Sequence, residues 1–244
     1  MIPGRVTVQN RIEREVSMQI GKVVLQGTLG NPVSAKGIVL FAHGSGSSRN
    51  SPRNRFVAGE LQSAAMATLL FDLLTPEEEA VDQTTMQLRF NIRLLAKRLV
   101  GATRWVQRNP ATAGLRVAYF GASTGAAAAL MACAQLPETI AAVVSRGGRP
   151  DLAGEALGSV RAPTLLIVGG NDQPVIAMNE QAWAELGCRE KQIVIIPGAT
   201  HLFEEPGALA TVARLAAEWF SNRFTGADHA QTDCESSQTF RQSE

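Results

Sequence analysis

Six short runs of apolar residues constrain the fold of this chain more than any other feature. Apolar and polar side chains do not alternate within the runs, so each predicts a strand that is buried on both faces of a sheet. Longer segments with apolar residues at helical spacing separate them. Strands that alternate with helices predict a mostly parallel sheet with helices on both faces. The runs lie at residues 37–42, 68–74, 115–120, 140–145, 164–168 and 192–196.

The rest of the chain extends this α/β pattern to eight strands in one domain. Residues 14–20 and 22–28 predict an antiparallel pair that turns at Gly21. The longest segment between strands is one helix, so we expect no cap domain. We predict one domain over residues 1–224 and a flexible polar tail over residues 225–244. The expected helices lie at residues 53–67, 83–107, 124–136, 175–186 and 206–224.

Composition narrows the class of protein. Lys and Arg number 23 against 22 Asp and Glu, so the net charge is +1 and predicts neither a nucleic-acid nor a membrane partner. Three cysteines argue against a disulfide framework, and the first 20 residues lack the apolar core of a secretory signal. We therefore expect a cytoplasmic protein.

The segment Gly121-Ala122-Ser123-Thr124-Gly125 lies between the strand at 115–120 and an alanine-rich helix. This G-x-S-x-G pattern places a serine on a sharp strand-to-helix turn, where its hydroxyl is exposed beyond the sheet. Ser123 is the predicted nucleophile. The Thr124 N–H and the helix N-terminus are predicted to stabilise a developing oxyanion. The alternative is an ordinary turn that uses glycine and serine only for the bend.

A serine nucleophile needs a general base, and the chain has three histidines. His201 follows the last predicted strand and precedes the last helix, which makes it the predicted base. His229 lies in the polar tail. His43 opens the glycine-rich loop 43–48, where we expect either a structural tie of the loop or a contact to substrate. The Ser45 N–H of the same loop is the predicted second oxyanion donor.

The triad order serine, acid, histidine places the acid between Ser123 and His201. Asp172 follows the strand at 164–168 and is the preferred candidate, because it would hold His201 in the required tautomer. Asp151, which follows the preceding strand, is the competing candidate.

Two arginines, Arg146 and Arg149, follow a predicted strand at the sheet edge where α/β proteins bind ligands. Arg146 is a candidate for binding a substrate carboxylate or phosphate through two hydrogen bonds. The alternative is a structural arginine in an ion pair. Candidate partners for that pair are Asp151, Glu155 and the acidic segment 77–79, which also fits the first turn of a helix.

Several segments together resemble the α/β-hydrolase superfamily, in its dienelactone hydrolase-like branch. The chain is most similar to hydrolase domains found fused to, or encoded beside, phosphoribosyltransferases. The resemblance implies an eight-stranded sheet, a Ser/Asp/His triad and esterase chemistry. Dienelactone hydrolase itself has a cysteine where this chain has Ser123, so the resemblance does not extend to that substrate. The matching segments are 41–48, 71–79, 120–125, 145–151, 166–172 and 197–207.

These observations predict a serine hydrolase for small or short-acyl carboxylic esters or lactones. We expect no metal and no organic cofactor, because neither an H-E-x-x-H motif nor a nucleotide-binding glycine motif is present. The same residues would serve an acyltransferase, and a non-catalytic binding module is a third hypothesis. The expected partner is a small-molecule ester. Homo-oligomerisation and association with a phosphoribosyltransferase stay open.

Overall fold

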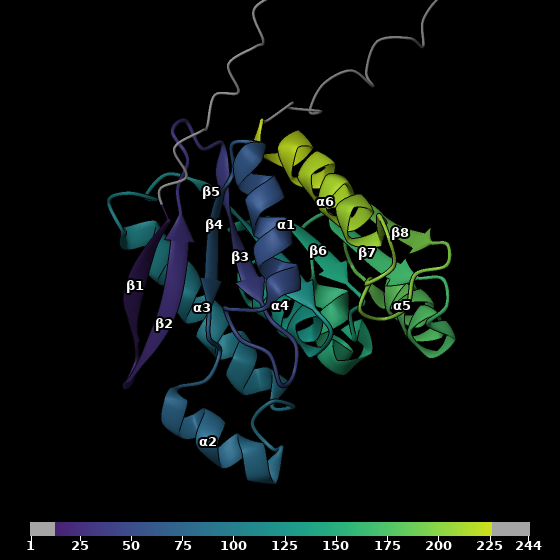
Figure 1. The fold of residues 1–244 in the computed structure, drawn as a ribbon, viewed down its shortest axis with the longest axis horizontal. Coiled ribbons are helices and arrows are strands. Elements are labelled where there is room, and N and C mark those ends of the chain that lie inside the picture. Colours follow the sequence, from purple (N-terminus) through teal and green to yellow (C-terminus); the bar gives the residue numbers. More distant parts are fainter. Residues whose placement is uncertain (1–12, 226–244) are drawn as a thin grey trace, which may run out of the picture.

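The computed structural model describes residues 13–225, and its core is one twisted sheet of eight strands (Figure 1). The strand order is β1-β2-β4-β3-β5-β6-β7-β8. β2 pairs antiparallel with both β1 and β4, and all other neighbours are parallel. The predicted eight-stranded α/β fold is therefore confirmed. The strands are β1 (Glu13–Ile20), β2 (Val23–Gly30), β3 (Gly37–Ala42), β4 (Ala67–Phe71), β5 (Arg116–Ala122), β6 (Ile140–Arg146), β7 (Thr164–Gly169) and β8 (Lys191–Ile196).

Helices cover both faces of the sheet and divide the core into two layers. α1 and α6 pack on one face, and α3, α4 and α5 pack on the other (Figure 1). Alternate residues of β3 illustrate the division, since Leu40 joins the layer under α3 and α4 while Phe41 joins the layer under α1 and α6. The α-helices are α1 (Pro52–Ser63), α2 (Pro76–Thr85), α3 (Ile92–Arg108), α4 (Thr124–Gln135), α5 (Gln173–Glu185) and α6 (Ala208–Phe224).

The prediction of one helix over residues 83–107 is wrong, because the structure has two helices there. α2 begins at a capping box formed by Thr75 and Glu78, so the acidic segment 77–79 lies in its first turn. Its C-cap is Met86, which adopts a left-handed conformation with φ of 55°. Asn91 then caps α3 by accepting from the Leu94 N–H at 3.0 Å. The caps at Thr75 and Asn91 therefore decide where the helices begin, although the apolar spacing continues from one helix to the next.

The short link between α2 and α3 is fixed by one carboxylate. Asp82 is fully buried, accepts from the backbone N–H groups of Leu88 and Arg89 at 2.7 and 3.1 Å, and binds the Arg89 side chain. A further element that the sequence analysis did not predict, the 3-10 helix η1 (Pro150–Ser159), lies between β6 and β7. It contacts α4 and α5 and extends the layer that α3, α4 and α5 form on one face of the sheet.

Within residues 13–225, no helix is both long enough and apolar enough to cross a membrane. Apart from Thr225, the predicted polar tail over residues 225–244, with His229 and Cys234, lies outside the described residues.

Candidate active site

Ser123 occupies the sharp turn between β5 and α4. Its φ of 50° and ψ of −123° lie in a region that residues other than glycine rarely adopt. Backbone hydrogen bonds hold this conformation. The Ser123 N–H donates to the Arg146 carbonyl at 3.3 Å, and the Ser123 carbonyl accepts from the Arg149 N–H at 3.0 Å. The β6–η1 loop therefore supports the strained turn on which the serine sits.

The glycines of the motif allow the close packing that this turn requires. A Cβ atom at Gly121 would lie 2.5 Å from the Cα of Ala126. A Cβ atom at Gly125 would overlap the carbonyl oxygen of Ala42 and lie 2.5 Å from that of His43. Neither position has room for a side chain, so α4 can begin directly against the end of β3 only with glycine at both.

His201 and Asp172 come together from two neighbouring loops at the same edge of the sheet. The Nδ1 of His201 lies 2.7 Å from Oδ2 of Asp172. The two loops are joined by the Asn171 N–H, which donates to the Ala199 carbonyl at 2.9 Å, and by the Asn171 side chain, which donates to the Gly198 carbonyl at 2.9 Å. The contact between the Asp172 carboxylate and Nδ1 of His201 fixes the orientation of the imidazole and favours the tautomer with the proton on Nδ1.

The competing acid, Asp151, has a different partner. Both of its carboxylate oxygens accept from the Arg149 guanidinium, with distances of 2.9 and 2.7 Å from Nε and Nη2. This pair raises the pKa of Arg149. The carboxylate that contacts His201 is therefore that of Asp172. Arg149 forms an ion pair with Asp151, which is the structural alternative to substrate binding that the sequence left open.

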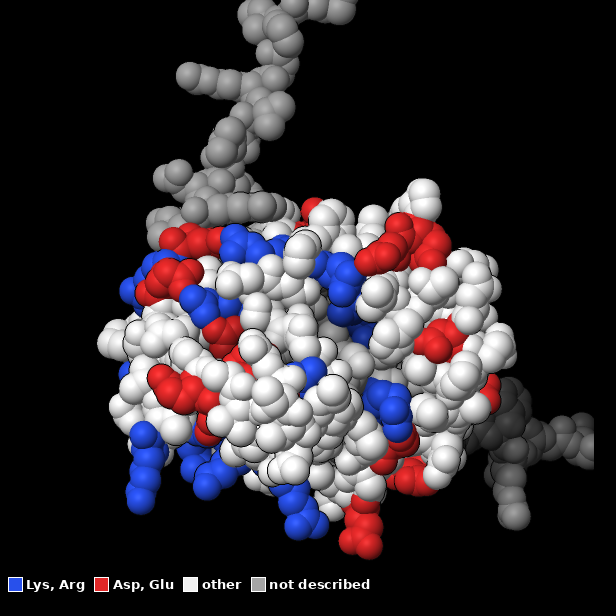
Figure 2. All heavy atoms as spheres, turned by 60° about the horizontal axis from the view of Figure 1, so that its bottom comes forward, with Lys and Arg blue, Asp and Glu red and all other residues white. Residues whose placement is uncertain are grey.

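Ser123 and His201 line one cavity of about 250 Å³. It lies at the C-terminal ends of the parallel strands, the edge at which open α/β sheets bind ligands. Figure 2 shows this face hollowed near its centre, with basic side chains gathered at the hollow. Gly44, Ser45 and Arg146 contribute to the wall. The remaining lining residues are Ser47, Ser51, Arg53, Asn54, Ala122 and Leu202.

Two backbone N–H groups beside Ser123, those of Thr124 and Ser45, are the predicted oxyanion donors, and Ser45 is among the residues that line the cavity. Thr124 is the first residue of α4, so its N–H has no partner within the helix. Ser45 follows Gly44, which lies so close to the serine that a Cβ atom there would be 3.0 Å from Cβ of Ser123. Within residues 13–225, neither N–H forms a hydrogen bond to another residue. Both therefore remain free for a ligand oxygen.

His43 is a buried residue whose two ring nitrogens are already engaged. Its Nε2 accepts from the Leu73 N–H at 3.1 Å, and its Nδ1 lies 3.0 Å from the Gly44 carbonyl. Burial lowers the pKa of His43, which favours the neutral ring that this pairing requires. His43 does not line the Ser123 cavity. The geometry thus gives it the structural role of tying its loop to the end of β4, and leaves no ring nitrogen for a substrate.

Arg146, at the end of β6, differs from Arg149 because it forms no ion pair with an acidic side chain among residues 13–225. Its side chain is buried, and its Nη2 lies 3.4 Å from the amide oxygen of Asn54. Its guanidinium carbon lies 5.9 Å from the ring centre of Phe203. Arg53 and Asn54, which share the cavity with it, belong to the first turn of α1. Sequence reasoning missed both, because no motif marks them and only the packing of α1 brings them to the site.

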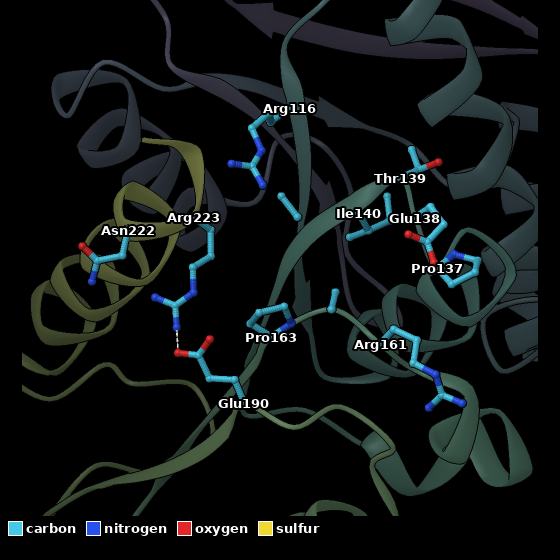
Figure 3. A pocket seen from close by; sticks show the side chains of 12 residues that line it. Arg116, Pro137, Glu138, Thr139, Ile140, Arg161, Pro163, Glu190, Asn222 and Arg223 are labelled. Atoms are coloured by element: carbon cyan, nitrogen blue, oxygen red, sulfur yellow. Dashed lines mark hydrogen bonds and ion pairs between the residues drawn. The ribbon is translucent and has the colours of Figure 1, made fainter. Parts of the chain in front are cut away.

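A larger cavity of about 560 Å³ lies at the opposite end of the sheet, where β5, β6, β7 and β8 begin (Figure 3). Its lining contains no serine, cysteine or histidine. Figure 3 shows the Arg223 side chain reaching Glu190, with which it forms an ion pair. This cavity therefore lacks the combination of a serine and a histidine that the Ser123 cavity has. Among residues 13–225, no group of three or more side chains is arranged to bind a metal ion.

The fold and this geometry define an α/β-hydrolase with a serine at its strand-to-helix turn. The chain belongs to the dienelactone hydrolase family, whose model matches residues 25–228. It is also similar to a solved dienelactone hydrolase from Anabaena variabilis, with 63% identity and a TM-score of 0.85. That match covers 87% of this chain and 98% of that one. The chain is therefore a hydrolase of this family.

Two other relatives extend the comparison. A Mycobacterium tuberculosis protein named "Putative phosphoribosyl transferase" is 56% identical over 214 residues, which are 88% of this chain and 47% of the relative. This chain thus spans about half the length of that curated relative. Est1E from Butyrivibrio proteoclasticus has a TM-score of 0.73 over 87% of this chain and 99% of its own, at 12% identity, and shares the fold.

Proposed function

We propose that this chain is a serine hydrolase that cleaves small or short-acyl carboxylic esters or lactones. The observation that carries the proposal is the hydrogen bond of 2.7 Å between His201 and Asp172, at the cavity that Ser123 also lines. A serine on a strained turn, a histidine fixed by a carboxylate and two free N–H groups are the parts that acyl transfer to water requires.

The residues at the cavity and its two loops divide the steps of the proposed reaction between them. Ser123 Oγ attacks the carbonyl carbon while His201 Nε2 takes the hydroxyl proton. Asp172 accepts from Nδ1–H and stabilises the imidazolium. The oxyanion accepts from the N–H groups of Thr124 and Ser45.

The intermediate then expels the alcohol, to which His201 returns the proton. A water molecule, deprotonated by His201, attacks the acyl-enzyme, and the carboxylic acid leaves as Ser123 regains its proton.

The size of the cavity supports small substrates. Its volume of about 250 Å³ lies below the range of pockets that enclose drug-sized ligands. Among the elements of residues 13–225, none forms a domain inserted over the cavity, and the His201 side chain is 38% exposed. A short acyl group fits such a site, whereas a long chain would extend into solvent.

Hydrolysis of p-nitrophenyl esters from acetate to decanoate tests the proposal. We expect kcat/KM to fall with acyl length in the wild type. Ser123→Ala should lower kcat by a factor on the order of 10⁶, because His201 and Asp172 without a nucleophile contribute little. Ser159→Ala, an exposed serine at the end of η1, is the matched control and should match the wild type. Full activity in Ser123→Ala would refute the proposal, and failure to label with a fluorophosphonate would favour a non-catalytic binding module.

The proposal includes a partner. The mycobacterial relative is named for a phosphoribosyltransferase, and more than half of its length lies outside the matched segment. We infer that the hydrolase domain works beside a phosphoribosyltransferase domain. Co-elution of this chain with the separately expressed remainder of the mycobacterial relative, in size-exclusion chromatography, tests this association. Separate elution at micromolar concentration would contradict it.

A further inference from the structure

Asn179 is a polar residue of the protein interior that no sequence motif marks. It lies on α5, the helix whose N-cap is Asp172, and its side chain is fully buried. Its Nδ2 donates to the Gly148 carbonyl at 3.0 Å and to the Val175 carbonyl at 2.7 Å. Because two carbonyl oxygens face the same end of the amide, its NH2 group must point towards them. Asn179 therefore ties α5 to the loop between β6 and η1.

The bond to Gly148 distinguishes an amide from an apolar side chain at position 179. Val175 lies one turn earlier in the same helix, so the bond to its carbonyl joins α5 to no other element. Within residues 13–225, the Oδ1 of Asn179 is buried without a hydrogen-bond partner. A leucine has the same branched shape and would avoid this unfavourable burial of a polar atom. The contribution of the amide to the structure is therefore its bond to the loop.

The Gly148 carbonyl belongs to the same peptide group as the Arg149 N–H. That N–H donates to the Ser123 carbonyl at 3.0 Å. A trans peptide group is planar, and its C=O and N–H point in opposite directions, so a hydrogen bond at one end fixes the direction of the other. Asn179 thus orients the N–H group that holds the carbonyl of Ser123.

The Ser123 carbonyl belongs in turn to the same peptide group as the Thr124 N–H, one of the two oxyanion donors in the proposed reaction. This carbonyl accepts from the Arg149 N–H at 3.0 Å and from the Ala126 N–H at 3.1 Å. The second bond lies within the first turn of α4, so Arg149 supplies the bond that comes from outside the helix. Two peptide groups therefore connect the Asn179 amide to the Thr124 N–H in one chain of hydrogen bonds.

Packing encloses the middle of this chain of hydrogen bonds. A Cβ atom at Gly148 would lie 2.6 Å from Cβ of Ala126 and would overlap the Oγ of Ser145. A Cβ atom at Gly147 would lie 3.0 Å from the carbonyl oxygen of His201. The loop thus runs between the first turn of α4 and the proposed base. Packing fixes where the loop lies, and the bond from Asn179 fixes the direction of its peptide group.

We propose that Asn179 is a positioning residue, which directs the Thr124 N–H at the oxyanion through the Gly148–Arg149 and Ser123–Thr124 peptide groups. This inference rests on the proposed serine hydrolase function, in which Thr124 is an oxyanion donor. Hydrogen bonds in a chain polarise one another, so the bond from Asn179 also strengthens the Thr124 N–H as a donor. A donor aligned in advance stabilises the charged transition state more than the neutral ester.

Steady-state kinetics on p-nitrophenyl acetate test the proposal. Asn179→Leu removes both donor hydrogens, and we expect kcat to fall about tenfold with KM nearly unchanged, since complete loss of an oxyanion donor lowers kcat by about 10²-fold or more. Asn179→Gln keeps a donor and should recover part of the loss. A kcat equal to that of the wild type in Asn179→Leu would overturn the inference. If that variant fails to fold, Asn179→Ala, which removes the same donors without adding volume, takes its place.

Two control variants separate the orientation of the donor from the stability of the fold. Thr103→Val removes the buried hydrogen bond of 2.6 Å to the Tyr119 hydroxyl, so it should lower the melting temperature and keep the wild-type kcat. Asn31→Ala removes a surface bond from an amide to the Ala111 carbonyl and should change neither quantity. If Thr103→Val lowers kcat as much as Asn179→Leu does at a similar melting temperature, the inference is overturned.

A tetrahedral analogue measures the contact to the oxyanion directly. The ketone 1,1,1-trifluoro-2-butanone adds to a serine hydroxyl, and the resulting hemiketal carries a negative oxygen where the oxyanion forms. In Asn179→Leu its inhibition constant should rise by about the same factor as kcat falls. An unchanged inhibition constant beside a lowered kcat would overturn the inference, because the lost activity would then not come from the oxyanion contact.

Nuclear magnetic resonance of the wild type tests the chain of hydrogen bonds without any variant. Couplings across hydrogen bonds should connect Asn179 Nδ2 with the Gly148 carbonyl carbon, and the Arg149 nitrogen with the Ser123 carbonyl carbon. Absence of either coupling would overturn the inference.

The same spectra keep this inference distinct from the proposed reaction. If the wild type hydrolyses no ester, both couplings and a shifted Thr124 amide resonance in Asn179→Gln support the positioning, and only the proposed hydrolysis fails. Hydrolysis by the wild type with an unchanged kcat in Asn179→Leu leaves the hydrolase proposal standing and overturns the role of Asn179.

Discussion

Asp172 and His201 are 29 positions apart in the chain, yet their side chains meet at 2.7 Å. β7 and β8 are parallel neighbours in register, so the loops that follow them leave the sheet side by side. Gly169, at the end of β7, permits this contact, because a Cβ atom there would lie 2.5 Å from the Ala199 carbonyl oxygen. The proposed base and its carboxylate are therefore positioned by strand pairing.

Replacing the carboxylate tests its role directly. Asp172→Asn should lower kcat by about 10⁴-fold while the protein remains folded, because an amide allows the wrong histidine tautomer. Steady-state kinetics on p-nitrophenyl acetate measure the change. Asp151→Asn is the matched control, since Asp151 pairs with Arg149, and its kcat should stay within a few-fold of the wild type. The reverse order of the two effects would identify Asp151 as the acid.

A methyl group at Gly125 should destabilise the fold. Gly125→Ala places a Cβ atom against the carbonyl oxygens of Ala42 and His43, which are backbone atoms that cannot rotate away. We expect a loss of about 3 kcal/mol in the free energy of unfolding, measured by urea denaturation. Gly158→Ala is the control, because nothing lies within 4 Å of a Cβ atom there. Equal stability of the two variants would show that α4 does not need this close approach.

Gly44 provides a test of the proposed oxyanion donor in the neighbouring loop. In Gly44→Ala the new Cβ atom would lie 3.0 Å from Cβ of Ser123 and 3.2 Å from the Ala122 carbonyl oxygen, so the loop that carries Ser45 must move. Loss of one oxyanion donor typically lowers kcat by about 10²-fold or more. We expect that loss with little change in the melting temperature. A kcat equal to that of the wild type would contradict the prediction that this close contact with Ser123 positions the loop for catalysis.

The buried His43 predicts a dependence of stability on pH. Burial holds its pKa below the ordinary value of 6.5, so the unfolded chain binds more protons in this range. The contribution of neutral His43 is present above about pH 6.5 and is lost as the pH falls through its lowered pKa in the folded state.

Urea unfolding from about pH 8 to about pH 5 measures this effect in the wild type and in His43→Asn. The wild type should lose more stability on acidification than the variant, in which position 43 does not titrate. An equal loss in both proteins would assign the pH dependence to other groups.

The fold could be predicted from the sequence because its signals are local. Unbroken apolar runs such as residues 37–42 indicate buried strands, and the spacing between them indicates crossover helices. The error at residues 83–107 arose where two signals compete. Met86 and Phe90 continue an apolar spacing, but Thr75 and Asn91 each cap a separate helix, and the two apolar side chains are exposed.

The sequence by itself determined the order of the eight strands along the chain, the sharp turn at Ser123, and the choice of Ser123, Asp172 and His201 as candidates. Each depends on residues close together in the chain or on their order along it. Only the tertiary structure decided that His43 uses both ring nitrogens within the fold and that Asp151 pairs with Arg149. It also decided that the buried Arg146 has no acidic partner in the described part of the chain. Whether a charge is paired depends on which loops and helices meet in space, and the meeting of α1 with the end of β6 has no signature in the local sequence.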